Sequence, residues 1–370
     1  MTRYYFYFYL ICMLINTIFF VPRILLAQRF DGAIMALIAA VGIGTALAVT
    51  FTKSIGRFPG KGLPEIFAGF MPLPIRTPIL IFMGIMWIIS GSIIIIAFSF
   101  ITNRYLSPET SPQLLLICFC GICSWASTRK ASSIISVTEI IILVNLPIVA
   151  FIMYKSFSQK LFDWDSVKIM TDYVFVKPSW SLLAAATYPF SGYINFAIYN
   201  RYFKELKVTH LWLVPVIGAF VLFTSIVVPI GLLGTSAVGD YLYTWISAAD
   251  TLRMQYGFIE RVVFLFLFIY IGFSLLFVTI CWNIGIQLIC GCLPDRLTKK
   301  KRSRIVTYWC IAGVNAAVTF WTGVLSNDKG MINFVKIWLN LRLGSEIALV
   351  ALMAVLAWLH VSRRRNREHA

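Results

Sequence analysis

Charge is scarce in this 370-residue sequence, and most of it has one sign. Charged residues make up 13% of the chain, against about 25% in a soluble domain. Hydrophobic residues make up 59%, against about 45–50% in soluble domains. A water-soluble fold cannot hide so much apolar surface behind so few charges. The composition excludes a secreted domain, a cytosolic enzyme and a disordered tail, and it predicts an all-α polytopic membrane protein.

Acidic residues and histidines are few, which bears on metal and catalytic chemistry. The eight cysteines lie in or beside apolar runs and show no disulfide framework. The run 118–123 (CFCGIC) has no His, Asp or Glu near it, which favours packed thiols over a zinc site. His210, His360 and His369 have no acidic partner at motif spacing, so hydrolytic or acyl-transfer chemistry is not indicated. We expect no enzyme activity, no metal and no cofactor.

The sequence contains many long runs of apolar residues. A bilayer crossing needs about 20 mainly apolar residues in helical form. We predict ten such helices, at residues 4–22, 33–52, 77–100, 112–128, 132–153, 179–199, 211–233, 262–288, 305–324 and 343–361. The first shares with a signal peptide the basic Arg3 before an apolar run, but its length, its aromatic residues and the Pro22-Arg23 exit favour a retained helix.

The 32 basic residues outnumber the 15 acidic ones, and two kinds of protein show such an excess. Nucleic-acid binding needs the positive charge gathered on one accessible face. Membrane proteins instead keep Lys and Arg in their cytoplasmic connections. Here the charges lie between apolar runs, and most basic residues fall in alternate connections, so we expect a lipid bilayer and no nucleic acid as partner. Both termini are predicted to be cytoplasmic, with a basic tail at 362–370.

Ten helices with little extramembrane mass fit two five-helix repeats of opposite orientation, a 5+5 inverted repeat with broken helices 1 and 6. The repeats would cover about residues 1–155 and 176–363 of a single domain spanning 1–370. Helix 6 contains Tyr188-Pro-Phe-Ser-Gly-Tyr-Ile-Asn195, in which Pro189 removes a backbone donor and Gly192 tolerates unwound geometry. A proline kink filled by neighbouring helices is the alternative to a break that lines a ligand site.

Polar side chains at the two breaks are the candidate ligand-binding groups. In helix 1 the polar residues precede Pro22 in an otherwise apolar run. The candidate set is Asn16, Thr17, Tyr188, Ser191, Gly192, Tyr193 and Asn195. Ser191 and Asn195 are the local side chains able to satisfy backbone groups freed by a break.

Other polar residues within the apolar runs have different predicted roles. Glu139 is a candidate proton or coupling site, because an acid inside a membrane helix is energetically expensive. The alternative is that it snorkels or pairs with Arg129 or Lys130. Three asparagines are predicted to bond between helices rather than to bind ligand. They are Asn145, Asn283 and Asn315.

Short motifs occur in a fixed order along the whole chain. They are Pro22-Arg23, Phe58-Pro-Gly-Lys-Gly-Leu-Pro-Glu-Ile-Phe67, Phe190-Ser-Gly-Tyr193, Asn200-Arg-Tyr-Phe-Lys-Glu-Leu-Lys207 and Phe258-Ile-Glu-Arg261. In order and spacing they resemble the spore germination permeases, the B subunits of germinant receptors, which are similar to amino acid–polyamine–organocation transporters. The resemblance implies a LeuT-like fold of ten helices that binds a small nutrient germinant, often an amino acid, in the spore inner membrane of a bacterium.

The resemblance also implies partners and carries over particular residues. The partners are an A-type membrane subunit and a C-type lipoprotein subunit. Pro22, Gly192 and the pair Glu260-Arg261 match by position, and we expect that pair to fix the eighth helix. Ile194 stands where the family often has an acid, and Tyr270 where Trp is common, which predicts a different or more apolar ligand, or a lost one. The rival function is secondary active amino acid transport with Glu139 as the proton site, which fold alone does not separate from reception.

Overall fold

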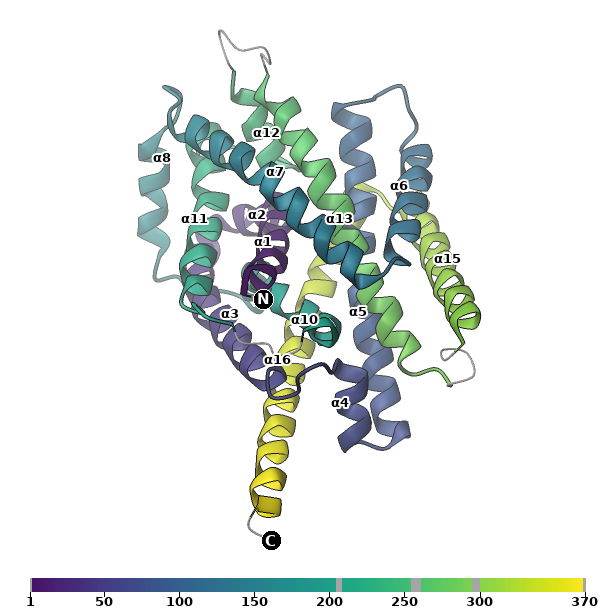
Figure 1. Cartoon of the computed structure of the whole chain (residues 1–370). Helices are drawn as coiled ribbons and strands as arrows, with labels where there is room; N and C mark the ends of the chain where they lie inside the picture. The colour runs from purple at the N-terminus through teal and green to yellow at the C-terminus, as the bar shows by residue number, and fades with distance from the viewer. Residues whose placement is uncertain (1, 204–207, 254–260, 295–299, 369–370) are drawn as a thin grey trace.

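The computed structural model describes residues 2–203, 208–253, 261–294 and 300–368, and these are helical, without a β-strand (Figure 1). The helices of the first part are α1 (Thr2–Ile18), α2 (Phe20–Ala27), the π-helical η1 (Arg29–Ala33), α3 (Ile34–Ile55), α4 (Leu63–Phe70), α5 (Leu73–Tyr105), α6 (Pro112–Ser127), α7 (Ala131–Phe157), α8 (Trp164–Lys168) and the 3₁₀ segment η2 (Ile169–Tyr173). Those of the second part are α9 (Trp180–Thr187), the 3₁₀ segment η3 (Tyr188–Asn195), α10 (Phe196–Tyr199), the 3₁₀ segment η4 (Asn200–Tyr202), α11 (Leu213–Leu233), α12 (Thr244–Thr251), α13 (Val262–Cys290), α15 (Lys301–Leu325) and α16 (Asp328–Glu368).

Among the described residues, seven helices are long and apolar enough to cross a membrane. They are Arg29–Ile55, Leu73–Tyr105, Ala131–Phe157, Leu213–Leu233, Val262–Cys290, Lys301–Leu325 and Lys329–Arg363. The bent pair α1–α2 makes an eighth when it is counted as one crossing, and α6 is a shorter apolar helix. The chain is therefore a multi-pass membrane protein. Each of the ten predicted ranges falls on a helical segment, although the sixth is a composite of α9, η3 and α10.

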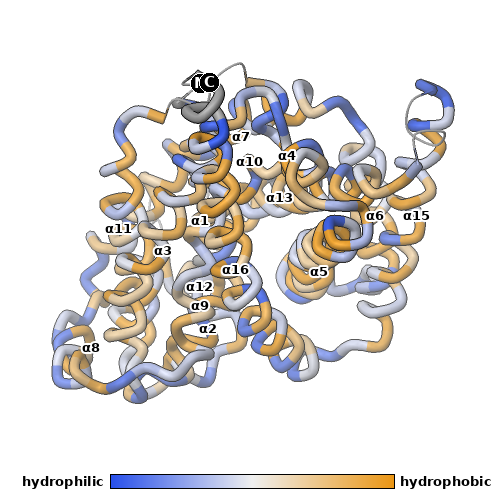
Figure 2. The backbone as a smooth tube through the Cα atoms, turned by 90° about the horizontal axis from the view of Figure 1, so that it is seen from below, coloured by the Kyte–Doolittle hydropathy of each residue, from blue (hydrophilic) through white to orange (hydrophobic). Residues whose placement is uncertain are grey.

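Apolar side chains face outward on the peripheral helices. On α15, Val314, Val318 and Trp321 are between 60% and 66% exposed, and on α7 both Ile140 and Val144 are exposed. Figure 2 shows hydrophobic colour along the helices and hydrophilic colour gathered in the connecting segments. Such continuous apolar surface is a liability in water but is the surface that lipid covers.

The helices pack in two groups. In one, α1 contacts η3 and α11, and α3 contacts α9, η3 and α11. In the other, α5 runs along α13, both contact α6, and α6 carries α15. Figure 1 shows α3 and α11 on the left and α5, α6 and α15 on the right, with α1 between them. The helix α16 contacts both groups, through α3 and α9 on one side and α5 on the other.

Aromatic side chains hold α1 against the sixth predicted helix. The rings of Phe8 and Tyr199 stack with their centroids 4.8 Å apart, and those of Tyr5 and Phe196 lie 5.3 Å apart. All four side chains are buried. Their contacts bring the two predicted breaks, which lie far apart in the sequence, into one region of the core.

The last helix differs most from its predicted range. The expected span began at residue 343, whereas α16 begins at Asp328 and runs to Glu368. The charged residues that precede residue 343, among them Lys329, Lys336 and Arg342, therefore lie within the helix. Its charged side chains Arg342 and Glu346 are buried, with 4% and 2% exposure.

Candidate functional site

The first predicted break is a bend between α1 and α2. Phe19, with φ −88° and ψ −111°, leaves the helical region between the two helices, whose axes differ by 51°. Pro22 was expected to close the first helix, and this is wrong. It lies in the first turn of α2, which continues to Ala27, and a proline there removes no helical hydrogen bond.

Asn16 lies just before this bend and is buried. Its side-chain amide donates to the carbonyl oxygen of Cys12, 2.7 Å away in the preceding turn. The side chain of Thr17 lies outside the described residues. The Asn16 amide group therefore serves, in this conformation, the helix to which it belongs.

The second predicted break is a change of helix type. Residues Tyr188–Asn195 form the 3₁₀ segment η3 between α9 and α10, and Pro189 is its second residue. The flanking residues Thr187 and Phe196 keep right-handed helical dihedrals. The expectation of unwound backbone is therefore wrong, since the chain tightens its helix here instead of leaving it.

Gly192 has a different role from the one predicted. A Cβ atom at this position would lie 2.6 Å from the Cα of Tyr9 and 2.9 Å from the carbonyl oxygen of Phe8. No side chain larger than hydrogen fits between these backbones. Gly192 thus allows α1 and η3 to touch, as small residues do at close helix crossings in membranes.

Replacing Gly192 with alanine should force α1 and η3 apart. We expect Gly192→Ala to destabilise the protein by about 1–2 kcal/mol, as overpacking of a filled core does, and to lower the thermal midpoint in detergent. Gly121→Ala in α6 is the matched control, because a Cβ there meets nothing within 4 Å. Equal midpoints for the two variants would contradict the close contact.

A buried ion pair lies against η3. Arg342 and Glu346, one turn apart on α16, pair with each other. The Tyr193 hydroxyl donates to Glu346 Oε1 over 2.6 Å, and the Ser191 hydroxyl donates to Glu346 Oε2 over 3.0 Å. Arg342 Nη1 donates to Ser191 Oγ over 2.7 Å, while Nη2 donates to the carbonyl oxygen of Ala184 over 2.6 Å. Two of the predicted site residues therefore bind a charged pair that the sequence prediction missed.

Tyr188 completes the cluster on the other side of the guanidinium. Arg342 lies over the Tyr188 ring, 5.0 Å from its centroid, and the Trp338 ring packs edge-on against Tyr188 at 5.2 Å. The Tyr188 and Ser90 hydroxyls share a hydrogen bond of 2.5 Å. We name the set Ser191, Tyr193, Tyr188, Arg342 and Glu346 the α16 charge cluster.

Two small cavities adjoin the α16 charge cluster. One, of about 20 Å³, is lined by Tyr188, Ser191, Asn195 and Arg342 among others. The other, of about 10 Å³, is lined by Asn16, Tyr188 and Trp338 among others. A cavity of roughly 10–15 Å³ holds one water molecule. The structure thus gathers Asn16, Tyr188, Ser191, Tyr193 and Asn195 around one region, but in a conformation closed to anything larger than water.

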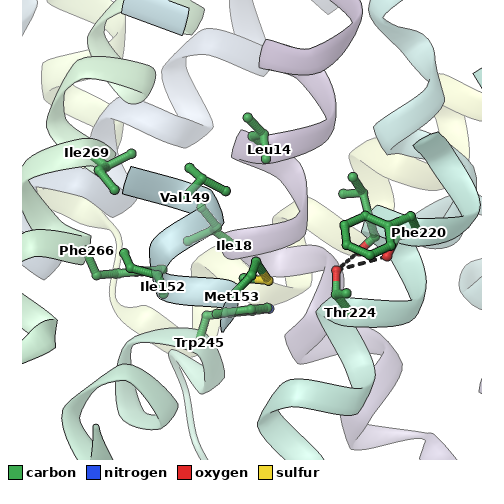
Figure 3. A pocket seen from close by; sticks show the side chains of 11 residues that line it. Leu14, Ile18, Val149, Ile152, Met153, Phe220, Thr224, Trp245, Phe266 and Ile269 are labelled. Atoms are coloured by element: carbon green, nitrogen blue, oxygen red, sulfur yellow. Dashed lines mark hydrogen bonds between the residues drawn. The ribbon is translucent and has the colours of Figure 1, made fainter. Parts of the chain in front are cut away.

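A larger void lies on another side of α1, and it is apolar. Its volume is about 70 Å³, and Figure 3 shows Leu14, Ile18 and Trp245 among the side chains around it. The hydroxyl of Thr224 at its edge donates to the carbonyl oxygens of Phe220 and Val221. This void has no free polar group in its described lining that would orient a ligand.

The remaining sequence candidates lie apart from the α16 charge cluster or outside the description. The alternatives to a functional Glu139 were that it snorkels or pairs with Arg129 or Lys130. It instead pairs with Arg3, at 3.2 Å, and is 22% exposed. Glu260 lies outside the described residues, and Arg261 directly precedes α13. Cys120 and Cys123 are buried free thiols, and within the described ranges no three His, Cys, Asp or Glu side chains gather as metal ligands would.

Of the three predicted interhelical asparagines, Asn283 has that role. Its amide donates to the carbonyl oxygen of Ser127 over 2.7 Å, and its oxygen accepts from the Tyr199 hydroxyl over 3.2 Å. Asn145 donates within its own helix, to the carbonyl oxygen of Ile141. Asn283 therefore ties α13 to both α6 and α10.

Two of the motifs that carry the family resemblance contact each other. Arg201 binds Glu65 through two contacts of 2.8 Å, and Arg201 Nη1 donates to Gln287 Oε1 over 3.1 Å. The amide of Asn200 donates to the carbonyl oxygen of Phe58 over 2.8 Å. The connection before α4 and α4 itself are thus bound to η4, and η4 is bound to α13.

A scan against protein-family models and a search of curated proteins found no match to this chain.

Proposed function

We propose that this chain is the B-type subunit of a spore germinant receptor, a transporter-like membrane protein that binds a small nutrient, an amino acid in the first place. The observation that carries the proposal is the α16 charge cluster, which lies where the bend between α1 and α2 meets the 3₁₀ segment η3. Ligand sites of inverted-repeat transporters lie where such irregular segments meet. A buried charge in a membrane protein is a functional candidate by default.

The packing of the helices supports a ten-helix, 5+5 inverted-repeat arrangement. The first and second predicted helices of each half, α1–α2 with α3 and α9–α10 with α11, pack in one group. The third and fourth of each half, α5 with α6 and α13 with α15, pack in the other. Equivalent helices of the two halves thus occupy equivalent groups, as two related repeats would. The contact between Glu65 and Arg201 adds that two family-like motifs are structurally linked.

In this proposal the protein lies in the spore inner membrane with both termini cytoplasmic. It assembles with an A-type membrane subunit and a C-type lipoprotein. Ligand binding shifts the population between the closed conformation and one in which α16 and η3 separate, because a ligand changes an equilibrium only when it prefers one state.

Deletion of the gene tests this function. Spores without the chain should lose germination in response to one class of nutrient, and a wild-type copy should restore it. The chain should also co-purify with the products of neighbouring genes for the A-type and C-type subunits. Unchanged germination with every nutrient would contradict a receptor role.

A secondary active amino acid permease is the second candidate. In a permease, Glu346 rather than the predicted Glu139 would be the proton site, because Glu346 is the buried acid of the two. Reconstituted vesicles distinguish the two functions. Saturable accumulation of a labelled amino acid under an imposed proton gradient would establish transport, whereas ligand binding without accumulation would support reception.

A further inference from the structure

The α16 charge cluster contains a complete carboxylate-binding site. Glu346 accepts hydrogen bonds from the Ser191 and Tyr193 hydroxyls and from the Arg342 guanidinium. An arginine together with neutral hydroxyl donors is a recurring means of holding a carboxylate. Arg342 and Glu346 are the buried charged side chains of the described residues. In this conformation the site therefore holds a carboxylate of the protein itself, that of Glu346.

The same region has donors to spare. Arg342 Nε and Trp338 Nε1 are buried and have no hydrogen-bond partner among the described residues. Both side chains line the cavity of about 20 Å³ next to Ser191. A buried donor without an acceptor is destabilising unless a second molecule satisfies it. These donors therefore need acceptor oxygens from a molecule in the cavity, and a ligand carboxylate would supply them.

Resting on the proposed function, we infer that Arg342 is the anchor for the carboxylate of a small ligand, and that Glu346 occupies the place of this carboxylate in the closed state. The ligand displaces Glu346 from Arg342 and breaks the bonds of Glu346 to Ser191 and Tyr193. Arg342 keeps its bond to the carbonyl oxygen of Ala184 in α9. Because Glu346 belongs to α16 and the two hydroxyls belong to η3, the exchange loosens α16 from η3. The cavity, now large enough for one water, opens as the two separate.

Thermal shifts of the full-length chain in detergent test this inference. The probes are the common L-amino acids, their carboxamides, and a set of uncharged sugars and nucleosides. We expect at least one amino acid to raise the melting temperature and its carboxamide to have no effect at the same concentration. Glu346→Gln leaves Arg342 buried without its anion, so the unliganded variant should melt below the wild type. Measured from that lower starting point, the concentration for half the shift should fall about tenfold, because the competing carboxylate is gone and more of the folded protein is binding-competent.

The double variant Arg342→Gln/Glu346→Gln keeps the polar shape without either charge and avoids leaving one charge buried alone. It should fold and show no shift with amino acids. Equal shifts for an amino acid and its carboxamide, or a wild-type response in the double variant, would overturn the carboxylate anchor. Shifts with sugars or nucleosides alone would overturn it and leave the proposed function standing. No shift with any probe, in the wild type or in Glu346→Gln, would overturn the proposed function together with the inference.

Discussion

Arg342→Gln should be among the most destabilising single substitutions in this protein. It leaves the Glu346 carboxylate buried at 3% side-chain exposure without its cation. Breaking a buried ion pair by removing one partner costs about 3–5 kcal/mol, because the remaining charge is neither solvated nor neutralised. Unfolding of the detergent-solubilised chain, followed by tryptophan fluorescence in increasing denaturant, would measure this loss.

Removal of both charges distinguishes the contribution of the ion pair to the free energy of unfolding from the cost of leaving one charge buried without a partner. The double variant Arg342→Gln/Glu346→Gln should recover part of the stability lost by Arg342→Gln, because no charge is left buried without its partner. Arg3→Gln is the control for an accessible pair, because the Arg3 side chain is 60% exposed in its contact with Glu139. It should leave the unfolding midpoint unchanged. If Arg342→Gln and Arg3→Gln shift the midpoint equally, the Arg342–Glu346 pair is not buried as described.

The sequence predicted the helices well, because their ranges follow from the lengths of apolar runs. The predicted 112–128 corresponds to α6 at Pro112–Ser127, and 211–233 to α11 at Leu213–Leu233. The place of the sixth irregularity also followed from local chemistry, since Pro189 and Gly192 lie in the segment that changes helix type. The helix ranges and the position of the 3₁₀ segment depend on residues adjacent in the sequence, so they can be predicted from the sequence alone.

The chemistry of the site depends on contacts between distant residues, and it was missed for that reason. The predicted span of 343–361 began directly after Arg342 and included Glu346, and nothing beside them in the sequence indicates their partner Ser191, which lies more than 150 positions earlier in the chain. Their spacing of four residues in an apolar run was the available signal, since opposite charges at this spacing share one helix face. Gly192 was assigned to unwinding because its local sequence does not show that Tyr9 packs against it.

The contact between α5 and α13 should be the most sensitive helix crossing to added volume. Gly84 and Gly285 face each other there, and a Cβ at Gly285 would lie 2.5 Å from Ile88 Cγ1 and 2.8 Å from the carbonyl oxygen of Gly84. Backbone cannot move aside as a flexible side chain can. Gly285→Val should therefore cost about 3 kcal/mol, at the upper end of overpacking in filled cores, and reduce the folded fraction.

Gly272→Val provides the matched control on the same helix. It makes the same change of residue and the same change in helix propensity, but a Cβ there meets its nearest atom, Asn145 Nδ2, at 3.6 Å, an ordinary contact. The folded fraction of each variant is measured by size-exclusion chromatography after solubilisation, with the thermal midpoint as second readout. Because α5 and α13 contact each other and both contact α6, Gly285→Val should also lower the stability of the group formed by α5, α6, α13 and α15. Equal behaviour of Gly285→Val and Gly272→Val would show that the close approach of Gly84 and Gly285 does not hold this group together.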